Sequence, residues 1–186
     1  MIDSATVKDA DALLPLLLSA IGPIAHTLSG TTDDVETWDV LRDFLSSEHN
    51  RLSFRNILVE RRDGAVAGML IAYSGDAAEE LDRPIRERLE SLHGEEAASA
   101  VVTECKPGDY YLDSIAVDER FQGQGIAKSL IAAFEERGRS QGYDKLSLIV
   151  EPYNEGAYAL YRKLGYKDDG LWQVSDGAYK RMIKQL

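Results

Sequence analysis

The chain is poor in the residues that build disulfides, metal centres and membrane spans. Its single cysteine, Cys105, cannot form an internal disulfide, which is typical of a reducing compartment and predicts a cytoplasmic protein. The three histidines (His26, His49 and His93) lack zinc-ligand spacing, so we predict no metal. No apolar run reaches the length of a bilayer-spanning helix, and the apolar stretch 13–21 follows acidic residues, unlike a signal peptide. We therefore expect no membrane partner.

Positive charge is also scarce. The chain has 21 Lys and Arg against 32 Asp and Glu, a formal net charge of −11. Nucleic-acid binding needs a basic patch, so we expect no nucleic acid as a partner. An acidic surface attracts cations, which makes an amine-bearing substrate a better fit than an anionic one. The alternative is that the charge only keeps the protein soluble.

The pattern of apolar residues predicts alternating strands and helices. Asp63-Gly64, between two apolar runs, indicates a two-residue hairpin turn. With 186 residues, the chain is long enough for one well-filled core and short for two. Strands are expected at 2–7, 56–62, 65–73, 109–117, 145–150, 166–171 and 178–184, and helices at 9–20, 34–47, 78–92, 124–140 and 154–164.

The most informative segment runs from Ile115 to Lys128. An apolar strand ends at Val117, a polar turn follows, and a segment containing Gly123 and Gly125 opens a helix. Glycine permits close approach of a ligand and unusual φ values, and the free N–H groups of a helix N-terminus bind anions. This order predicts a main-chain cradle for a pyrophosphate. The alternative is that the two glycines only relieve crowding in a tight turn, since neither the third glycine of a dinucleotide fingerprint nor a P-loop lysine is present.

A second motif follows after a short strand. Asn154 is placed to cap a helix whose apolar face is formed by residues three to four apart, and Gly165 stands where a helix commonly ends. The two motifs, in this order and spacing, resemble those of the GCN5-related N-acetyltransferase (GNAT) superfamily. The residues that match the family patterns are Gln122, Gly125 and Ala127 in the first motif, and Asn154, Tyr161, Gly165 and Tyr166 in the second.

The resemblance implies both a fold and an activity. The expected fold class is α/β (α+β), the GNAT fold: a central mixed, mostly antiparallel twisted sheet of about seven strands flanked by helices, with splayed fourth and fifth strands. Residues 1–186 would form a single domain. The implied activity is transfer of an acetyl or other acyl group from acetyl-CoA or another acyl-CoA to a primary amine of a small molecule or a protein. The alternative is an acyl-CoA-binding sensor without turnover.

The resemblance also assigns roles to residues. Tyr161 matches the general acid that protonates the CoA sulfur; the alternative is a tyrosine at the core edge. Asn154 would cap its helix and contact the cofactor, although the cap alone explains an asparagine there. Lys128 would add charge near the phosphates or be an ordinary solvated lysine. The expected cofactor-binding residues are Ile115, Ala116, Val117, Gln122, Gly123, Gln124, Gly125, Ile126, Ala127, Lys128 and Asn154.

The general base is not fixed by the family pattern. Relatives that carry a glutamate in the strand before the asparagine have it where this chain has Ile149. Asp113, two residues before Ile115, is expected on the same face by strand alternation and is our candidate for the second catalytic residue. Glu151 and proton removal through ordered water are the alternatives.

An insert of about residues 75–108 distinguishes this chain from a minimal family member. It holds a charged helix between the third and fourth strands. A run of charges usually forms a solvated face. The alternative is a lid, or a contact in a homodimer, near the acceptor site.

Overall fold

The computed structural model describes residues 1–174 and 177–186. Its centre is a seven-stranded sheet with strand order β1-β2-β3-β4-β5-β7-β6. The pairing is antiparallel everywhere except between β4 and β5, so the predicted mixed, mostly antiparallel sheet is confirmed. The strands are β1 (Ile2–Ser4), β2 (Ile57–Arg62), β3 (Ala65–Ser74), β4 (Tyr110–Val117), β5 (Lys145–Val150), β6 (Lys167–Val174) and β7 (Gly177–Gln185).

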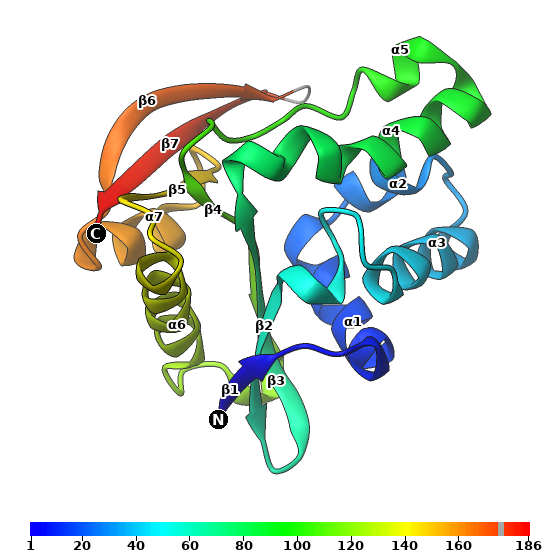
Figure 1. Cartoon of the computed structure of the whole chain (residues 1–186). Helices are drawn as coiled ribbons and strands as arrows, with labels where there is room; N and C mark the ends of the chain where they lie inside the picture. The colour runs from blue at the N-terminus through cyan, green and yellow to red at the C-terminus, as the bar shows by residue number, and fades with distance from the viewer. Residues whose placement is uncertain (175–176) are drawn as a thin grey trace.

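Helices cover both faces of the sheet (Figure 1). On one face lie α1 (Ala10–Ile21), α2 (Ile24–Ser29), α3 (Asp34–Ser46), α4 (Ala78–His93) and α5 (Glu95–Ala98). On the other lie α6 (Ile126–Ser140) and α7 (Glu155–Lys163). Each layer encloses its own apolar cluster: Leu13, Leu17 and Ile57 belong to the first, and Leu130 and Phe134 to the second. We name these the α1 face and the α6 face.

The structure corrects the bounds of two predicted elements and adds two short helices. The strand expected at 2–7 ends at Ser4, because the Asp9 carboxylate accepts from the Thr6 N–H (2.8 Å) and hydroxyl (2.9 Å) and turns the chain into a 3-10 turn. The helix expected from 124 begins at Ile126, after two glycines with positive φ. Helices α2 and α5 were not predicted, since they have six and four residues and are too short to show a periodic apolar pattern.

An irregularity in β4 changes which way its side chains point. Ser114 pairs with Ile71 and Leu112 with Ala72, so Asp113 is an extra residue, as in a β-bulge. The bulge reverses the alternation, because Tyr111 and Ala116 pack on the α1 face while Ile115 packs on the α6 face.

The expectation that Asp113 and Ile115 share a face is therefore wrong. The Asp113 carboxylate accepts a 2.6 Å hydrogen bond from the hydroxyl of Tyr73, a residue of the α1 face. Strand alternation predicts side-chain direction only while pairing is regular.

The splay of β4 and β5 is confirmed. Their pairing stops at Leu112 and Leu148, although β4 continues to Val117 and β5 to Val150. Beyond this point the backbone groups of β4 that face β5 have no strand partner among the described residues. The sheet is therefore open next to the Gly-rich turn.

The insert is only partly a solvated surface. Helix α4 exposes charged side chains such as Arg83, whose side chain is 61% exposed, but buries Asp82, Ile85 and Leu89. The chain after α5 then returns toward β4 and carries Glu104 inward. One face of the inserted helix thus belongs to the α1-face core.

A buried ion-pair group fixes the C-terminal hairpin of β6 and β7. Arg181, 1% exposed, donates to Asp109 (2.8 Å) and Asp169 (2.9 Å). The Trp172 indole donates to the backbone oxygen of Thr103 at 3.3 Å. These bonds hold the hairpin against the end of the insert.

Two glycines offer a matched test of the fold. A Cβ on Gly75 would lie 2.0 Å from the backbone oxygen of Lys106, which cannot move aside easily, whereas one on Gly156 in α7 would meet nothing within 4 Å. We expect Gly75→Ala to lower the free energy of unfolding by about 2 kcal/mol or more. We expect Gly156→Ala to raise it by about 0.5–1 kcal/mol, because alanine favours the helix. Urea denaturation measures both, and equal effects of the two substitutions would contradict this packing.

Candidate active site

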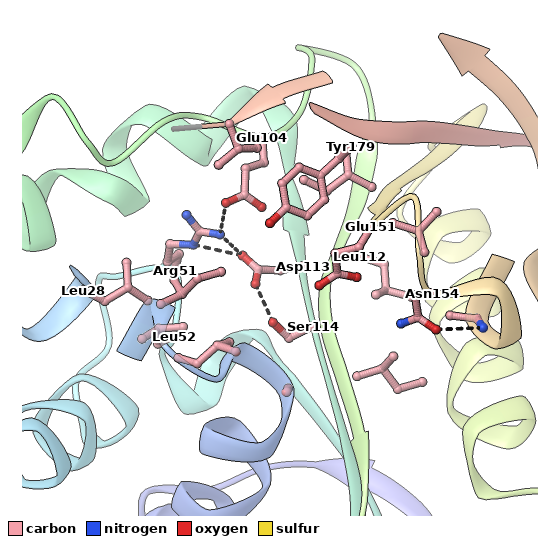
Figure 2. A pocket seen from close by; sticks show the side chains of 18 of the residues that line it. Leu28, Arg51, Leu52, Glu104, Leu112, Asp113, Ser114, Glu151, Asn154 and Tyr179 are labelled. Atoms are coloured by element: carbon pink, nitrogen blue, oxygen red, sulfur yellow. Dashed lines mark hydrogen bonds and ion pairs between the residues drawn. The ribbon is translucent and has the colours of Figure 1, made fainter. Parts of the chain in front are cut away.

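A cavity of about 260 Å³ opens where β4 and β5 diverge. Its walls come from α1 and α2, the end of the insert, β4, β5, the start of α7, and β7 (Figure 2). Four of the predicted site residues, Asp113, Ile115, Asn154 and Tyr161, line it together.

The wall formed by β5 and α7 carries Tyr161, Glu151 and Asn154. Asn154 caps α7, its side-chain oxygen accepting from the Ala157 N–H at 3.1 Å, so the predicted cap is confirmed. Tyr161 is 6% exposed, and burial, with a smaller effect from Glu151, raises the pKa of its phenol to about 12. Among the described residues neither the Tyr161 hydroxyl nor the Glu151 carboxylate has a side-chain partner. Both polar groups are available to a ligand.

The opposite wall centres on Asp113. Its Oδ2 accepts from Arg51 Nε (2.9 Å), Arg51 Nη2 (2.6 Å) and the Tyr73 hydroxyl (2.6 Å), while Oδ1 accepts from the Ser114 hydroxyl (2.8 Å). Each carboxylate oxygen has two lone pairs, so Oδ2 is fully used, whereas Oδ1, with one donor, can accept one more hydrogen bond. Asp113 is therefore fixed in position at the cavity wall.

Arg51 lies at the centre of a buried cluster, in which it contacts three carboxylates. Besides Asp113, its guanidinium contacts Glu104 (3.1 Å) and Asp82 (3.4 Å), and its side chain is 6% exposed. Burial alone would lower the pKa of Arg51, but Asp113 and Glu104 raise it well above its ordinary value. Burial raises the pKa of both Asp82 and Glu104 even though Arg51 acts in the opposite direction. The cluster therefore has three carboxyl groups but only the Arg51 guanidinium in contact with all of them, and positive charge is in deficit.

The Gly-rich turn lies at the start of α6. Gly123 and Gly125 have φ of 75° and 79°, conformations that L side chains rarely adopt, and a Cβ on either would meet nothing within 4 Å. The glycines are thus required by the turn and border open space. Ser129 N–H makes the first bond into the helix, to the oxygen of Gly125, so the N–H groups of the preceding turn have no intrahelical partner.

A groove of about 680 Å³ connects the turn with the cavity. It runs between α1 and the end of β4, and it shares Ala20 and Ile115 with the cavity. Of the predicted cofactor-binding residues, Ile115, Ala116, Val117 and Gln122 line this groove. The others, Gly123, Gln124, Gly125, Ile126, Ala127 and Lys128, lie beyond its end at the N-terminus of α6, with Ile126 buried and Lys128 exposed.

Sequence reasoning missed part of the cavity wall. Arg51 and Glu104 belong to no motif, and Tyr179 reaches the cavity from β7 (Figure 2). One signal for Glu104 was available in the sequence: it is an acidic residue that comes shortly after the largely apolar stretch 97–102. Cys105 lies nearby but is buried, and burial raises the pKa of its thiol to about 12, which makes it unreactive.

Residues 1–174 and 177–186 can also be described in terms of metal sites and membrane-spanning helices. Within them no group of three or more His, Cys, Asp or Glu is placed to hold a metal ion. None of their helices combines the length and the apolar character that crossing a bilayer requires.

Several known proteins are similar to the chain. A crystal structure of an acetyltransferase is 32% identical in sequence and superposes with a TM-score of 0.80. The match covers 100% of this chain and 98% of that one. An N-acetyltransferase from Staphylococcus aureus Mu50 has the same fold, with a TM-score of 0.80, 23% identity, and coverage of 99% and 100%.

The curated relatives match over shorter stretches. Uncharacterized N-acetyltransferase YdgE of Bacillus subtilis (strain 168) is 38% identical over 56 residues, 30% of this chain and 36% of its own length. Human N-acetyltransferase 8B is 38% identical over 56 residues, 30% of this chain and 25% of its own. The match spans about a third or less of these two proteins.

The family assignment rests on the larger part of the chain. A sequence model of the acetyltransferase (GNAT) family matches residues 26–166, which include the Gly-rich turn, both cavity walls and Tyr161. The order of the strands, the splay of β4 and β5 and the solved structures agree with it. This chain belongs to the acetyltransferase (GNAT) family.

Proposed function

We propose that the protein is an N-acetyltransferase that moves an acetyl or other acyl group from acetyl-CoA or another acyl-CoA to a primary amine of a small molecule or a protein. The observation that carries the proposal is the single cavity lined by Asp113, Glu151 and Tyr161 at the point where β4 and β5 separate. The alternative is an acyl-CoA sensor without turnover, which the available proton donor at Tyr161 disfavours. The single cysteine of the sequence supports a cytoplasmic location, where disulfides are rare.

The open edge of β4 would bind the pantetheine arm. Backbone groups of residues 115–117 that face away from β3 have no strand partner in the described part of the chain, so they can pair with the pantetheine amides as an added strand would. The N–H groups at the start of α6, in and after the glycine turn, would receive the pyrophosphate. Asn154 borders the same space from α7.

The reaction requires a balanced movement of protons. The acceptor ammonium first loses a proton, and the resulting amine nitrogen bonds to the thioester carbon. The carbon–sulfur bond then breaks. The nitrogen loses a second proton, and the departing thiolate gains a proton. Tyr161 would give its proton to the sulfur, because a phenol with a pKa of about 12 stays protonated at neutral pH. The products are an amide, free CoA and one proton.

Of the three carboxylates that line the cavity, Glu104 is bonded to Arg51 and Tyr111, which leaves Asp113 and Glu151 as candidates to accept the proton of the amine. Asp113 was expected from the sequence, but four hydrogen bonds from Arg51, Tyr73 and Ser114 leave it one acceptor position, on Oδ1. Glu151 has no side-chain partner among the described residues. We therefore propose that Glu151 accepts the proton and that Asp113 holds the ammonium in place beside it.

Substitution of these carboxylates separates the two roles. Glu151→Gln should lower kcat at neutral pH by about 10²-fold and remove the acidic limb of its pH profile, because the proton acceptor is lost. Asp113→Asn should chiefly raise KM for the amine. A kcat loss confined to Asp113→Asn would reverse the assignment.

The role of Tyr161 is tested by removing only its hydroxyl. We expect Tyr161→Phe to fold, to bind acetyl-CoA nearly as before, and to lose about 10²-fold or more in kcat. Release of free thiol from acetyl-CoA over a broad panel of amines is the measurement. The matched control is Tyr158→Phe on the same helix, whose hydroxyl contacts Asp168 outside the cavity.

Two other results would change the account. Unchanged kcat in Tyr161→Phe, measured where chemistry limits the rate, would remove the tyrosine from the mechanism. Tight acetyl-CoA binding with no thiol release from the unmodified protein over the whole panel would favour the sensor.

The glycine turn gives a separate test of cofactor binding. Gly125→Val should weaken acetyl-CoA binding far more than Gln124→Ala, because the cradle consists of main-chain groups that need a positive φ at Gly125. Gly142→Val controls for backbone strain, since Gly142 has a φ of 81° and open space around it but lies after the other end of α6. Isothermal titration calorimetry measures the affinities, and equal losses for Gly125→Val and Gln124→Ala would contradict the cradle.

A further inference from the structure

A second cavity, of about 160 Å³, adjoins the first. The two share Arg51 and Glu104, and also Ile24, Leu28 and Val174. Beyond this shared rim the second cavity is bounded by α2 and by the end of the insert, where Val101 and Val102 lie. Its charged lining is limited, within the part of the chain that the structure describes, to Arg51 and Glu104. We call this second cavity the apolar annex.

The first cavity is negatively charged where it meets the annex. Arg51 is its positive group, against Glu104, Asp113 and Glu151, while Asp82 lies directly behind Arg51. Arg86, a half-buried residue of α4, approaches Asp82 at 3.6 Å and donates to the Val101 backbone oxygen and the Thr103 hydroxyl, both at 3.1 Å, but does not line the cavity. An incoming ammonium would reduce this excess of negative charge, whereas an anion would increase it.

The Tyr161 hydroxyl is a further polar group in the cavity that can bind a ligand. The Tyr161 side chain is 6% exposed, lines the first cavity, and has no hydrogen-bond partner for its hydroxyl among the described residues. The side chain is buried, but its oxygen is not among the buried polar atoms that lack a partner, so the hydroxyl is open to the cavity, where a ligand can pair with it. This observation is independent of the acidic cluster, and it marks the same cavity as a ligand site.

Building on the proposed function, we infer that the acceptor is a small primary amine that carries a branched or aromatic apolar group. The ammonium would lie between Glu151 and the Arg51–Asp113–Glu104 cluster, and the apolar group would enter the annex past Ile24. The two cavities, of about 260 and 160 Å³, are each smaller than the roughly 300–1,000 Å³ of pockets for drug-sized ligands, so they suit a small acceptor. The insert thereby acquires a role, because its residues Ala100, Val101, Val102 and Glu104 line the annex and would meet the substrate.

Three probes of similar length test the two parts of the ligand separately. Isoamylamine has the ammonium and the apolar group, isoamyl alcohol lacks the charge, and putrescine replaces the apolar end with a second charge. Calorimetry on protein saturated with CoA gives their affinities without turnover. We expect isoamylamine to bind roughly tenfold or more tightly than either of the others, because each loses one of the two contacts.

Substitutions at the rim of the annex test where isoamylamine binds. Ile24, 37% exposed at the rim of both cavities, can change to Ser without disturbing the core. Ile24→Ser should weaken isoamylamine several-fold and leave putrescine within about twofold. The matched control is Val35→Ser, since Val35 is 64% exposed in the first turn of α3 and lines neither cavity. Glu104→Gln should weaken isoamylamine about tenfold, whereas Glu48→Gln, which changes an exposed ion pair with Arg55, should not.

The outcomes distinguish this inference from the proposed activity. Tighter binding of putrescine or of a short peptide with a free N-terminus would overturn the inference, as would an equal effect of Ile24→Ser on all probes. Thiol release with putrescine alone would overturn it and leave the transferase activity standing. Isoamylamine binding without any thiol release would support the inferred ligand and contradict the activity. Melting curves of each variant show whether it is folded.

Discussion

The loss of hydrogen bonding between β4 and β5 after Leu112 and Leu148 is the constraint on which the site depends. A continuous sheet would pair every backbone group in this region and leave no opening. The bulge at Asp113 accompanies the break and turns that carboxylate toward the α1 face, while Ile115 remains on the α6 face. One strand thus supplies residues to two sides of the same cavity.

The buried Arg51 cluster links the insert to this opening. Arg51 contacts Asp113 in β4, Asp82 in α4 and Glu104 at the end of the insert. Breaking a buried ion pair by removing one partner is costly, because the other charge is left uncompensated. The cluster therefore holds this side of the cavity in one arrangement, and its excess of negative charge is the basis of the proposed preference for a cationic acceptor.

Much of the fold was predictable because it is encoded locally. The hairpin at Asp63-Gly64, the cap at Asn154 and the glycine turn before α6 are short-range features, and all are present. The bulge was not predictable, since alternation presumes regular pairing. Arg51 could not be identified either, because its partners Glu104 and Asp113 lie 53 and 62 residues away in the sequence. Only the tertiary structure brings them together.

A crystal structure with a non-hydrolysable acetyl-CoA analogue tests the central claim most directly. The claim is that the opening between β4 and β5 holds the acyl-CoA with its reactive end at the cavity. The account predicts the pantetheine arm along residues 115–117, the pyrophosphate at the first turn of α6, and the analogue's sulfur position within hydrogen-bonding reach of the Tyr161 hydroxyl. An analogue bound outside the opening, or one whose reactive end points away from Tyr161, would contradict it.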